Sequence, residues 1–365
     1  MREKRASHIS RITLHFTQRI SPMKAVVFYE HGPLENVQYT DVPEPEIGPD
    51  EVLLEVKAAA LNRLDLWVLA GWPGLNLKLP HIMGSDGAGI IAKVGANVAD
   101  FTVGDRVAVN PTRGSDTDYF GRRGLDNMSD NFAILGEHED GFFAEYAAVP
   151  ARNLLKMPDD ADFTAAAAAS LVYVTAWHSL ITRGGLQAGE TVLIVGAGGG
   201  VNTAAIQVAK LAGAERIYVI GSTNEKLAEA EALGADVLIN RNEEDWGKAV
   251  FKATNRRGVD VVVDNVGAAT FHTSLRALKK GGRLLTVGNT SGPKFELDNR
   301  LIFGKHLSII GSTMGTSADY ATVMNLIFNG RLQPVIDSVY PLSEGLTALR
   351  RLEEGDVTGK LVLTP

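Results

Sequence analysis

The sequence predicts an α/β protein built from a β-rich part and a doubly wound parallel sheet. Short strand-like segments separated by Gly, Pro and Asp occupy the first half of the chain. From about residue 160, apolar runs rich in β-branched residues alternate with helical segments, a pattern typical of parallel sheets covered by helices. With 365 residues, 45% of them hydrophobic, the chain is long enough for two cores.

The composition excludes several functional classes. The net charge of -7 does not favour nucleic acid or an anionic membrane as a partner. No apolar run approaches the roughly 20 residues of a membrane span. The absence of cysteine excludes disulfides and thiolate metal sites. We therefore expect a cytoplasmic protein that acts on a small molecule.

Residues 1–22 differ in character from the rest of the chain. They carry four arginines and one lysine but a single acid, Glu3, and contain no strand-like pattern. A transit-type peptide is one interpretation of such a segment. We favour a disordered N-terminal extension, with Met23 at the start of the folded part.

Residues 23–155 form the predicted β-rich domain. Residues 51–60 alternate between apolar and polar side chains, as a half-buried strand does. Further strands are expected over residues 23–32, 84–94, 105–109 and 141–149. Residues 110–140 form a long polar excursion. Loops of this length are usually functional, or they are remnants of a segment that was once cross-linked.

Residues 156–305 form the predicted domain with the parallel sheet, and residues 306–365 close that sheet and return to the first domain. A helix is expected from residue 165 to 181. The expected strands cover residues 192–195, 216–220, 237–239, 259–264, 282–287 and 308–311. The expected helices cover residues 203–210, 225–233, 245–254, 271–278, 317–329 and 343–354. A last strand is expected at residues 360–363.

The strand at residues 192–195 runs directly into a glycine-rich turn and then a helix. Gly196, Gly198, Gly199 and Gly200 let the backbone approach a diphosphate closely, and the helix N-terminus, including Val201, offers free N–H groups. The motif is imperfect, because Asn202 stands where the third glycine of G-x-G-x-x-G would be.

Several segments together resemble the medium-chain dehydrogenase/reductase (MDR) superfamily. They are AALNRLDLWVLAG (59–71), GSDGAGIIAKVG (84–95), GDRVAV (104–109), LGEHEDGFFAEYAAVP (135–150), TAWHSL (175–180), the glycine turn and GKLVL (359–363). The resemblance implies a GroES-like catalytic domain, a Rossmann domain, a nicotinamide cofactor between them, and a homodimer or homotetramer. Asn62, Asp65 and GSDGAG resemble the zinc-free quinone oxidoreductase-like branch.

The resemblance also identifies where zinc members hold their metals. The four cysteines of the structural zinc correspond to Ser115, Asp118, Gly121 and Ser129. The catalytic zinc ligands correspond to Asn62, to Ser85–Asp86 and to the region of residues 171–173. A zinc site needs about three strong protein ligands, and these positions do not supply them. We expect no zinc, and a loop at 110–135 that is loose or packed by other means.

The predicted cofactor is NADPH, with NADH as the alternative. NAD-binding members carry an acid at the end of the second strand, where this chain has Gly221, Ser222 and Thr223. The hydroxyls of Ser222 and Thr223 are expected to donate hydrogen bonds to a 2′-phosphate. Lys226 and Arg241 offer positive charge for a 2′-phosphate; both are equally interpretable as solvated surface residues. The resemblance implies that the nicotinamide half lies against Thr175, Val266, Gly267, Gly288 and Asn289.

Without a metal, hydride transfer requires hydrogen-bond donors at the acceptor oxygen or an electron-poor acceptor. We expect Asn62 to make a polar contact to the substrate or to the nicotinamide side, and Tyr173 to donate a proton. Asp65 is expected to orient Asn62 or Arg63, or to be purely structural. Trp72 is expected to line an apolar substrate pocket.

Three functional hypotheses follow. The first is an NADPH-dependent, zinc-independent reductase of quinones or conjugated carbonyls. The second is an alcohol dehydrogenase acting on small alcohols or aldehydes through a metal with unexpected ligands. The third is a cofactor-binding protein with little catalysis, motivated by Asn202 in the phosphate turn.

Overall fold

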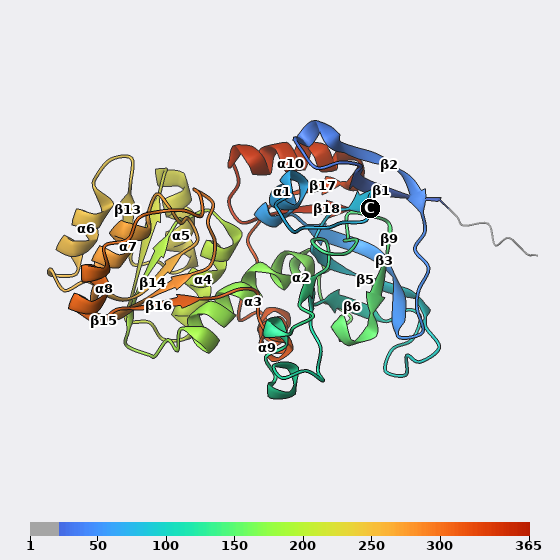
Figure 1. Ribbon diagram of the computed structural model, residues 1–365, viewed down its shortest axis with the longest axis horizontal. Coiled ribbons are helices and arrows are strands. Elements are labelled where there is room, and N and C mark those ends of the chain that lie inside the picture. The colour runs from blue at the N-terminus through green and yellow to red at the C-terminus, as the bar shows by residue number, and fades with distance from the viewer. Residues whose placement is uncertain (1–21) are drawn as a thin grey trace, which may run out of the picture.

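The computed structural model describes residues 22–365, and the predicted N-terminal extension therefore lies, apart from Pro22, outside the described residues. Figure 1 shows a β-rich body on one side and a helix-covered parallel sheet on the other. The protein is an α/β fold with a Rossmann domain and a β-rich, GroES-like domain.

The β-rich body is built on one large sheet with the strand order β10-β6-β5-β3-β18-β17, in which β9 also pairs with β3. A smaller sheet has the order β2-β1-β4, and β7 pairs with β8. The strands are β1 (Pro22–Phe28), β2 (Val37–Pro43), β3 (Glu51–Ala60), β4 (His81–Ile82), β5 (Asp86–Val94), β6 (Arg106–Val109), β7 (Thr112–Arg113), β8 (Ala133–Ile134), β9 (Tyr146–Pro150), β10 (Leu154–Lys156), β17 (Ile336–Pro341) and β18 (Lys360–Thr364).

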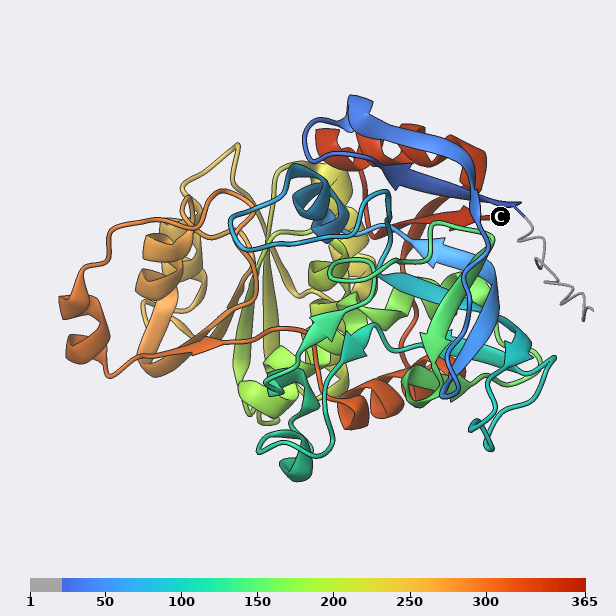
Figure 2. The same ribbon diagram turned by 45° about the vertical axis from the view of Figure 1, so that its right-hand side comes forward.

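The C-terminal strand belongs to this body. β18 pairs antiparallel with β3 and parallel with β17, and in Figure 2 the red end of the chain runs among the blue and cyan strands. Its buried residues Leu361 and Leu363 join the core formed by β1, β3 and β9. The start of β18 is thereby fixed beside the end of β3, a contact between residues about 300 positions apart.

The Rossmann sheet is parallel throughout, with the order β13-β12-β11-β14-β15-β16. Val192 and Ile194 of β11 pack on one core, and Leu193 and Val195 pack on another, so both faces of the sheet are buried. Its strands are β11 (Thr191–Val195), β12 (Arg216–Gly221), β13 (Val237–Asn240), β14 (Val259–Asp264), β15 (Leu278–Thr286) and β16 (Ser308–Gly311).

The helices of this domain cover the two faces separately. Side chains of α4 and α5 join the first of these cores, and side chains of α6 and α7 join the second. The α-helices of the chain are α1 (Arg63–Ala70), α2 (Phe163–Ser170), α3 (Val172–Trp177), α4 (Gly200–Leu211), α5 (Asn224–Leu233), α6 (Trp246–Ala253), α7 (Phe271–Ala277), α8 (Asn299–Lys305), α9 (Ser317–Phe328) and α10 (Gly345–Glu354).

The helix expected over residues 165–181 is broken in the structure. α2 ends at Ser170, α3 follows, and His178–Arg183 forms a π-helical turn, with a bend of 44° between the two pieces. Ala166 to Ala169 are fully buried, and their small side chains let α2 lie close against β3 and β5. Within residues 22–365, no single helix is long and apolar enough to cross a membrane, although this bent pair reaches that length and composition together.

The excursion at 110–140 is packed by hydrogen bonds. The four residues that correspond to the zinc-binding cysteines of zinc relatives meet around the Asp118 carboxylate. Asp118 accepts from Ser129 Oγ at 2.5 Å and from Gly121 N at 2.7 Å, and Ser115 N donates to Ser129 Oγ at 2.8 Å. The absent side chain of Gly121 is required, because a Cβ there would lie 1.8 Å from the carbonyl oxygen of Ser115. The lobe is thus held by an aspartate-centred network.

Candidate active site

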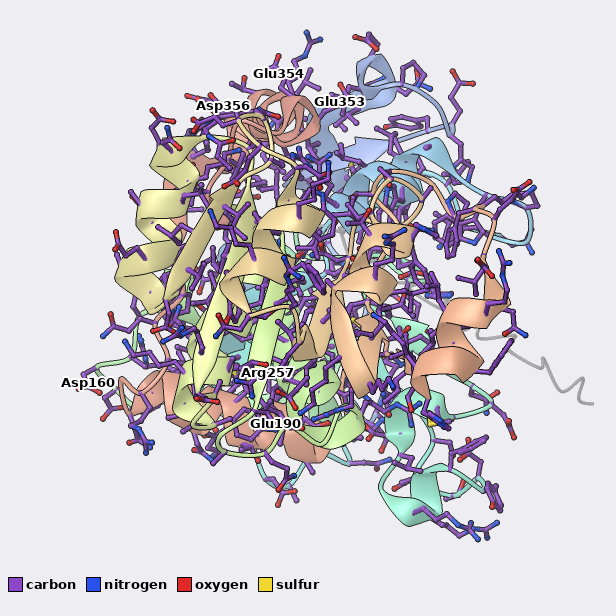
Figure 3. The ribbon with its side chains drawn as sticks, turned by 90° about the vertical axis from the view of Figure 1, so that its left-hand side faces the viewer. Asp160, Glu190, Arg257, Glu353, Glu354 and Asp356 are labelled. Carbon is purple, nitrogen blue, oxygen red and sulfur yellow. The ribbon has the colours of Figure 1, made fainter. Side chains whose placement is uncertain are left out.

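A cleft of about 810 Å³ lies between the two domains. Its walls come from the glycine turn and the ends of β12, β14 and β15 on one side, and from α1, the start of α3 and the start of β18 on the other. In Figure 3, Glu353 and Glu354 of α10 lie at the top of the molecule, and Glu190 and Arg257, which precede strands of the parallel sheet, lie toward the bottom. Ligands of such sheets bind at the carboxyl ends of the strands, which is where the cleft opens.

The glycine turn forms a cradle. Gly196 has φ +119°, and Gly196, Gly198, Gly199, Gly200 and Val201 all line the cleft. A Cβ on Gly198 would lie 3.0 Å from the Lys226 side chain, and a Cβ on Gly200 would lie 3.0 Å from that of Lys360. α4 begins at Gly200 without a side-chain cap, so its first N–H groups face the cleft. The turn therefore fits the diphosphate of a dinucleotide.

Asn202 does not obstruct this cradle. Its side chain is held by two hydrogen bonds: Nδ2 donates to the Val195 carbonyl at 3.1 Å, and Oδ1 accepts from Asn265 Nδ2. The glycine at 196 makes this possible, because a Cβ there would lie 2.0 Å from Asn202 Nδ2. Asn202 thus fixes the turn relative to β11 and β14.

The end of β12 presents no acid to the cleft. Gly221, Ser222, Lys226 and Arg241 line it, whereas Thr223 serves as the N-cap of α5 and accepts from Lys226 N. A Cβ on Gly221 would lie 2.6 Å from the buried Leu227 side chain, so this position does not accept a larger residue without repacking.

The expected nicotinamide contacts divide into two groups. Thr175, Val266 and Gly288 line the cleft. Gly267 and Asn289 do not line it among the described residues; they pack behind, where a Cβ on Gly267 would lie 3.0 Å from Asn289 Cα. The loop that contains Val266 is fixed by the Asp264 carboxylate, which accepts from Val266 N at 2.9 Å and from Gly267 N at 3.1 Å.

Opposite the glycine turn, three buried polar side chains form one cluster. Lys360 Nζ donates to Asn62 Oδ1 at 2.6 Å and to Asp86 Oδ2 at 2.9 Å, and Asn62 Nδ2 donates to the same Asp86 oxygen at 2.9 Å. All three residues are at most 6% exposed. Burial raises the pKa of Asp86, while the charge of Lys360 and the hydrogen bonds from Asn62 and Lys360 act against that rise.

Two phenylalanines hold the GSDGAG segment in place. A Cβ on Gly84 would lie 2.2 Å from the Phe143 ring, and a Cβ on Gly87 would lie 2.5 Å from the Phe142 ring. Gly84 also has φ +97°, a conformation that favours glycine. The glycines therefore let both rings pack directly against the backbone on either side of Asp86.

Asp65 acts on Asn62 through the backbone. Its Oδ2 accepts from Asn62 N at 2.7 Å and so caps α1. Burial raises the pKa of Asp65 to about 7. It does not line the cleft in the described part of the chain. Among the described residues, no hydrogen bond joins the Asp65 carboxylate to the side chain of Asn62 or Arg63, and the cap matches the purely structural role among those predicted.

The structure contradicts two of the predicted contacts. The Tyr173 hydroxyl donates to the Gln333 carbonyl at 2.7 Å and accepts from Gln207 at 2.7 Å, and burial raises its pKa. Tyr173 is therefore structural and not the proton donor, because its ring turns away from the cleft that its neighbour Val172 lines. Trp72 is exposed outside the cleft, and Trp67 of α1 lines it instead.

Zinc does not fit the residues at the ligand positions. Asn62 offers a neutral amide and Ser85 a neutral hydroxyl, whereas zinc is held by thiolates, imidazoles and carboxylates. The one carboxylate, Asp86, is engaged by the Lys360 ammonium at 2.9 Å, and a second cation beside that ammonium would be repelled. No group of three His, Asp or Glu side chains suited to a metal occurs within residues 22–365.

Two charged cleft residues were missed by the reasoning from sequence. Lys360 was visible as a lysine opening an otherwise apolar strand, and Glu137 as an acid in the LGEHEDGFF segment. Both line the cleft. Neither partner of Lys360 lies near it in the chain, so no local pattern indicated what it would contact.

The fold and the cleft define a two-domain, dinucleotide-dependent oxidoreductase. The chain matches the family models "Alcohol dehydrogenase GroES-like domain" over residues 48–159 and "Zinc-binding dehydrogenase" over residues 200–329.

Similar proteins cover almost the whole chain. A NAD-dependent alcohol dehydrogenase of Saccharolobus solfataricus is 32% identical over 94% of this chain and 100% of its own. An acryloyl-coenzyme A reductase of Sulfurisphaera tokodaii is also 32% identical, with the same coverage. A crystal structure of a NAD-dependent alcohol dehydrogenase has a TM-score of 0.90 at 40% identity, covering 94% of this chain and 100% of that one. The chain belongs to the medium-chain dehydrogenase/reductase superfamily and is an NAD(P)H-dependent oxidoreductase.

Proposed function

We propose that this protein is an NADPH-dependent, zinc-independent reductase of conjugated carbonyl compounds or quinones. The observation that carries the proposal is the Lys360 ammonium held between Asn62 and Asp86 at the cleft, at the positions where zinc members hold their metal. We further propose that it works in the cytoplasm as a homodimer or homotetramer.

In this proposal the glycine turn and the N-terminus of α4 hold the diphosphate. Ser222, Lys226 and Arg241 hold the 2′-phosphate, which favours NADPH over NADH because no acid repels it there. Thr175, Val266 and Gly288 face the nicotinamide half. A bound reduced nicotinamide supplies a hydride.

In this proposal the Lys360 ammonium acts as the electrophile. An ammonium has three donors, and two of them are used by Asn62 and Asp86. The third is available to the oxygen of an acceptor in the cleft, where it stabilises the negative charge that hydride transfer builds. One such donor typically accounts for roughly 10²–10³ in rate. Both ends of the Asn62 amide already have partners, so Asn62 orients Lys360.

The similar proteins support a reductase of conjugated carbonyls. They include acryloyl- and crotonyl-coenzyme A reductases besides alcohol dehydrogenases. An activated alkene accepts a hydride without a metal, because the negative charge is delocalised onto the carbonyl oxygen. An alcohol dehydrogenase acting on small alcohols or aldehydes is the second candidate, because relatives such as that of Saccharolobus solfataricus are named alcohol dehydrogenases.

The test is NADPH consumption by the purified protein with a panel of enones, enoyl thioesters, quinones and aldehydes. We expect turnover with at least one conjugated carbonyl or quinone, with saturated carbonyl products from the enones. Allylic alcohols as products would favour the alcohol dehydrogenase candidate. Tight NADPH binding with no turnover on any acceptor would contradict both and support the cofactor-binding hypothesis.

A further inference from the structure

Glu137 is the one acidic side chain among the described residues that line the cleft. It lies on the loop between β8 and β9, where its backbone N–H donates to the Ile134 carbonyl at 3.1 Å. Its neighbour Gly136 packs against the segment that carries Asp86, since a Cβ on Gly136 would lie 2.7 Å from Ser85 N. Nothing in the proposed binding of cofactor or acceptor oxygen uses this carboxyl group.

Within residues 22–365, the Glu137 carboxyl group has no cation to pair with. The residue is 9% exposed, and no hydrogen bond from the described residues reaches its side-chain oxygens. The nearest basic atom is His138 Nδ1 at 3.7 Å, but this nitrogen accepts the N–H of Ile134 at 3.2 Å. His138 is therefore neutral there, and burial lowers its pKa.

Burial raises the pKa of Glu137 to about 7. A general acid is most effective when its pKa lies near the working pH, since it is then protonated and still able to release the proton. The other charged side chains of the cleft are Arg63 of α1, Lys360 of β18, and Lys226 and Arg241 at the far end. The cleft thus contains a carboxyl group that can hold a proton near neutral pH.

We propose that Glu137 is the catalytic acid that protonates the α carbon of a conjugated carbonyl substrate. This inference rests on the proposed function and assigns the substrate class to α,β-unsaturated carbonyls in preference to simple aldehydes. Reduction of an aldehyde requires a proton only on oxygen, whereas reduction of an activated alkene requires a proton on carbon.

The reaction balances as follows. The β carbon gains a hydride, and the π electrons of the alkene move onto the α carbon and the carbonyl oxygen, where Lys360 stabilises the enolate. The bond between the α and β carbons is thereby single, and the enolate double bond joins the α carbon to the carbonyl carbon. When the α carbon takes the proton of the Glu137 carboxyl group, this enolate bond becomes single and the carbonyl C=O bond re-forms. Glu137 is left as a carboxylate and regains a proton from water at the mouth of the cleft.

The test compares Glu137→Gln and Glu137→Asp with wild type, and uses Glu139→Gln as the matched control. Glu139 lies two positions along the same loop, is more exposed, and pairs with Arg113 outside the cleft. Each protein is assayed with an enone and with a quinone, whose reduction needs no proton on carbon. The enone reaction is also run in D₂O, and the product is analysed for the position and stereochemistry of deuterium.

We expect Glu137→Gln to lower the kcat for the enone by about 10²-fold or more, to lower the kcat for the quinone far less, and to replace stereospecific deuterium at the α carbon by a random mixture. Glu137→Asp recovers part of the rate, and Glu139→Gln behaves as wild type. Equal losses on enone and quinone, or unchanged stereospecificity, would overturn the assignment.

A measurement on the free protein separates the two proposals. In infrared titration without cofactor, the difference spectrum of wild type minus Glu137→Gln should show a carboxylic acid band near neutral pH, because the contribution of Asp65 is common to both proteins and cancels. If this band is present but wild type reduces no acceptor, the proposed reductase function fails and Glu137 loses its catalytic role with it. If wild type reduces enones and the band is absent, only the assignment of Glu137 fails.

Discussion

At the scale of single residues, Lys360 connects the two halves of the site. Its stem lies beside Gly200 of the phosphate turn, and its ammonium contacts Asn62 and Asp86 of the β-rich body. The contacts with Asn62 and Asp86 span 298 and 274 positions of sequence. Reasoning from sequence identified Asn62 and the glycine turn correctly as cleft residues, but a contact across such a separation leaves no local pattern.

Replacing Lys360 by Met should destabilise the protein. The Asp86 carboxylate is fully buried, and removing the partner of a buried ion pair costs about 3–5 kcal/mol. We expect this loss in the free energy of unfolding at neutral pH, measured by denaturant titration. The double variant Asp86→Asn with Lys360→Met should recover much of it, because no charge is then left unpaired.

The loss of stability caused by Lys360→Met should become smaller as the pH falls. Burial raises the pKa of Asp86 above its unfolded value, and loss of Lys360 removes an opposing cause. The deficit of the single variant is therefore full at neutral pH and shrinks as the pH falls through the raised pKa, since a protonated carboxyl group needs no cation. A deficit that grows on acidification would show that Asp86 is not the group responsible.

Arg241 should determine the preference for the cofactor. Its replacement by Ala should raise the KM for NADPH roughly tenfold, because a charge-assisted hydrogen bond to phosphate is lost, and leave the KM for NADH unchanged. Arg257→Ala is the matched control, since this arginine lies at the opposite end of the sheet (Figure 3). Equal changes for NADPH and NADH would mean that Arg241 does not contact a 2′-phosphate.

At the scale of elements, the strands and helices of the Rossmann domain followed from the sequence because each is a local pattern of apolar residues. The break between α2 and α3 did not, because an alanine-rich run is equally compatible with a straight helix. The two pieces pack against different partners: α2 lies against β3, β5 and α9, and α3 lies against α4 and α9. β2, β17 and α8 were also missed. At most two residues of each are buried, so no apolar pattern marks them in the sequence.

The 110–135 lobe shows what replaces a structural metal. Hydrogen bonds from Ser129 and the backbone at Gly121 and Asp130 hold the pKa of Asp118 below its usual value. Asp118→Asn should loosen the lobe, seen as faster amide hydrogen exchange within residues 110–135 and not in the Rossmann sheet.

The Asp118 carboxylate stabilises the folded lobe above its unfolded pKa of about 3.9, and this stabilisation is lost as the pH falls through the lower pKa of the folded state. The variant and wild type should therefore converge in acid. Equal exchange rates in the lobe at neutral pH would show that the carboxylate does not hold it.

At the scale of the whole molecule, the two domains meet around the cleft through a few specific contacts. Gly359 N donates to the Gly198 carbonyl at 2.8 Å, and Lys226 Nζ donates to the Gly355 carbonyl at 2.8 Å. On the far side, Asp126 of the lobe caps α9 through Ser317, and Asn127 reaches His178, which pairs with Asp319 at 2.6 Å. The phosphate turn is therefore coupled to the β-rich body directly.

A dinucleotide bound across this junction should stabilise the whole chain. At a free NADPH concentration one hundred times Kd, the gain is about 2.7 kcal/mol, which a thermal unfolding scan detects as a higher Tm. Arg241→Ala should need more NADPH to reach the same Tm. An unchanged Tm at saturating NADPH would contradict a cofactor site in the cleft.

The most direct test of Lys360 as the electrophile that stands where zinc relatives have a metal combines metal analysis with turnover on one sample. The protein is dialysed against a chelator, its zinc content is measured, and NADPH-dependent reduction of a conjugated carbonyl is assayed before and after zinc is added back. We expect undiminished turnover at a zinc content far below one ion per chain, and no gain on adding zinc. Stoichiometric zinc whose removal abolishes turnover, and whose return restores it, would contradict this assignment.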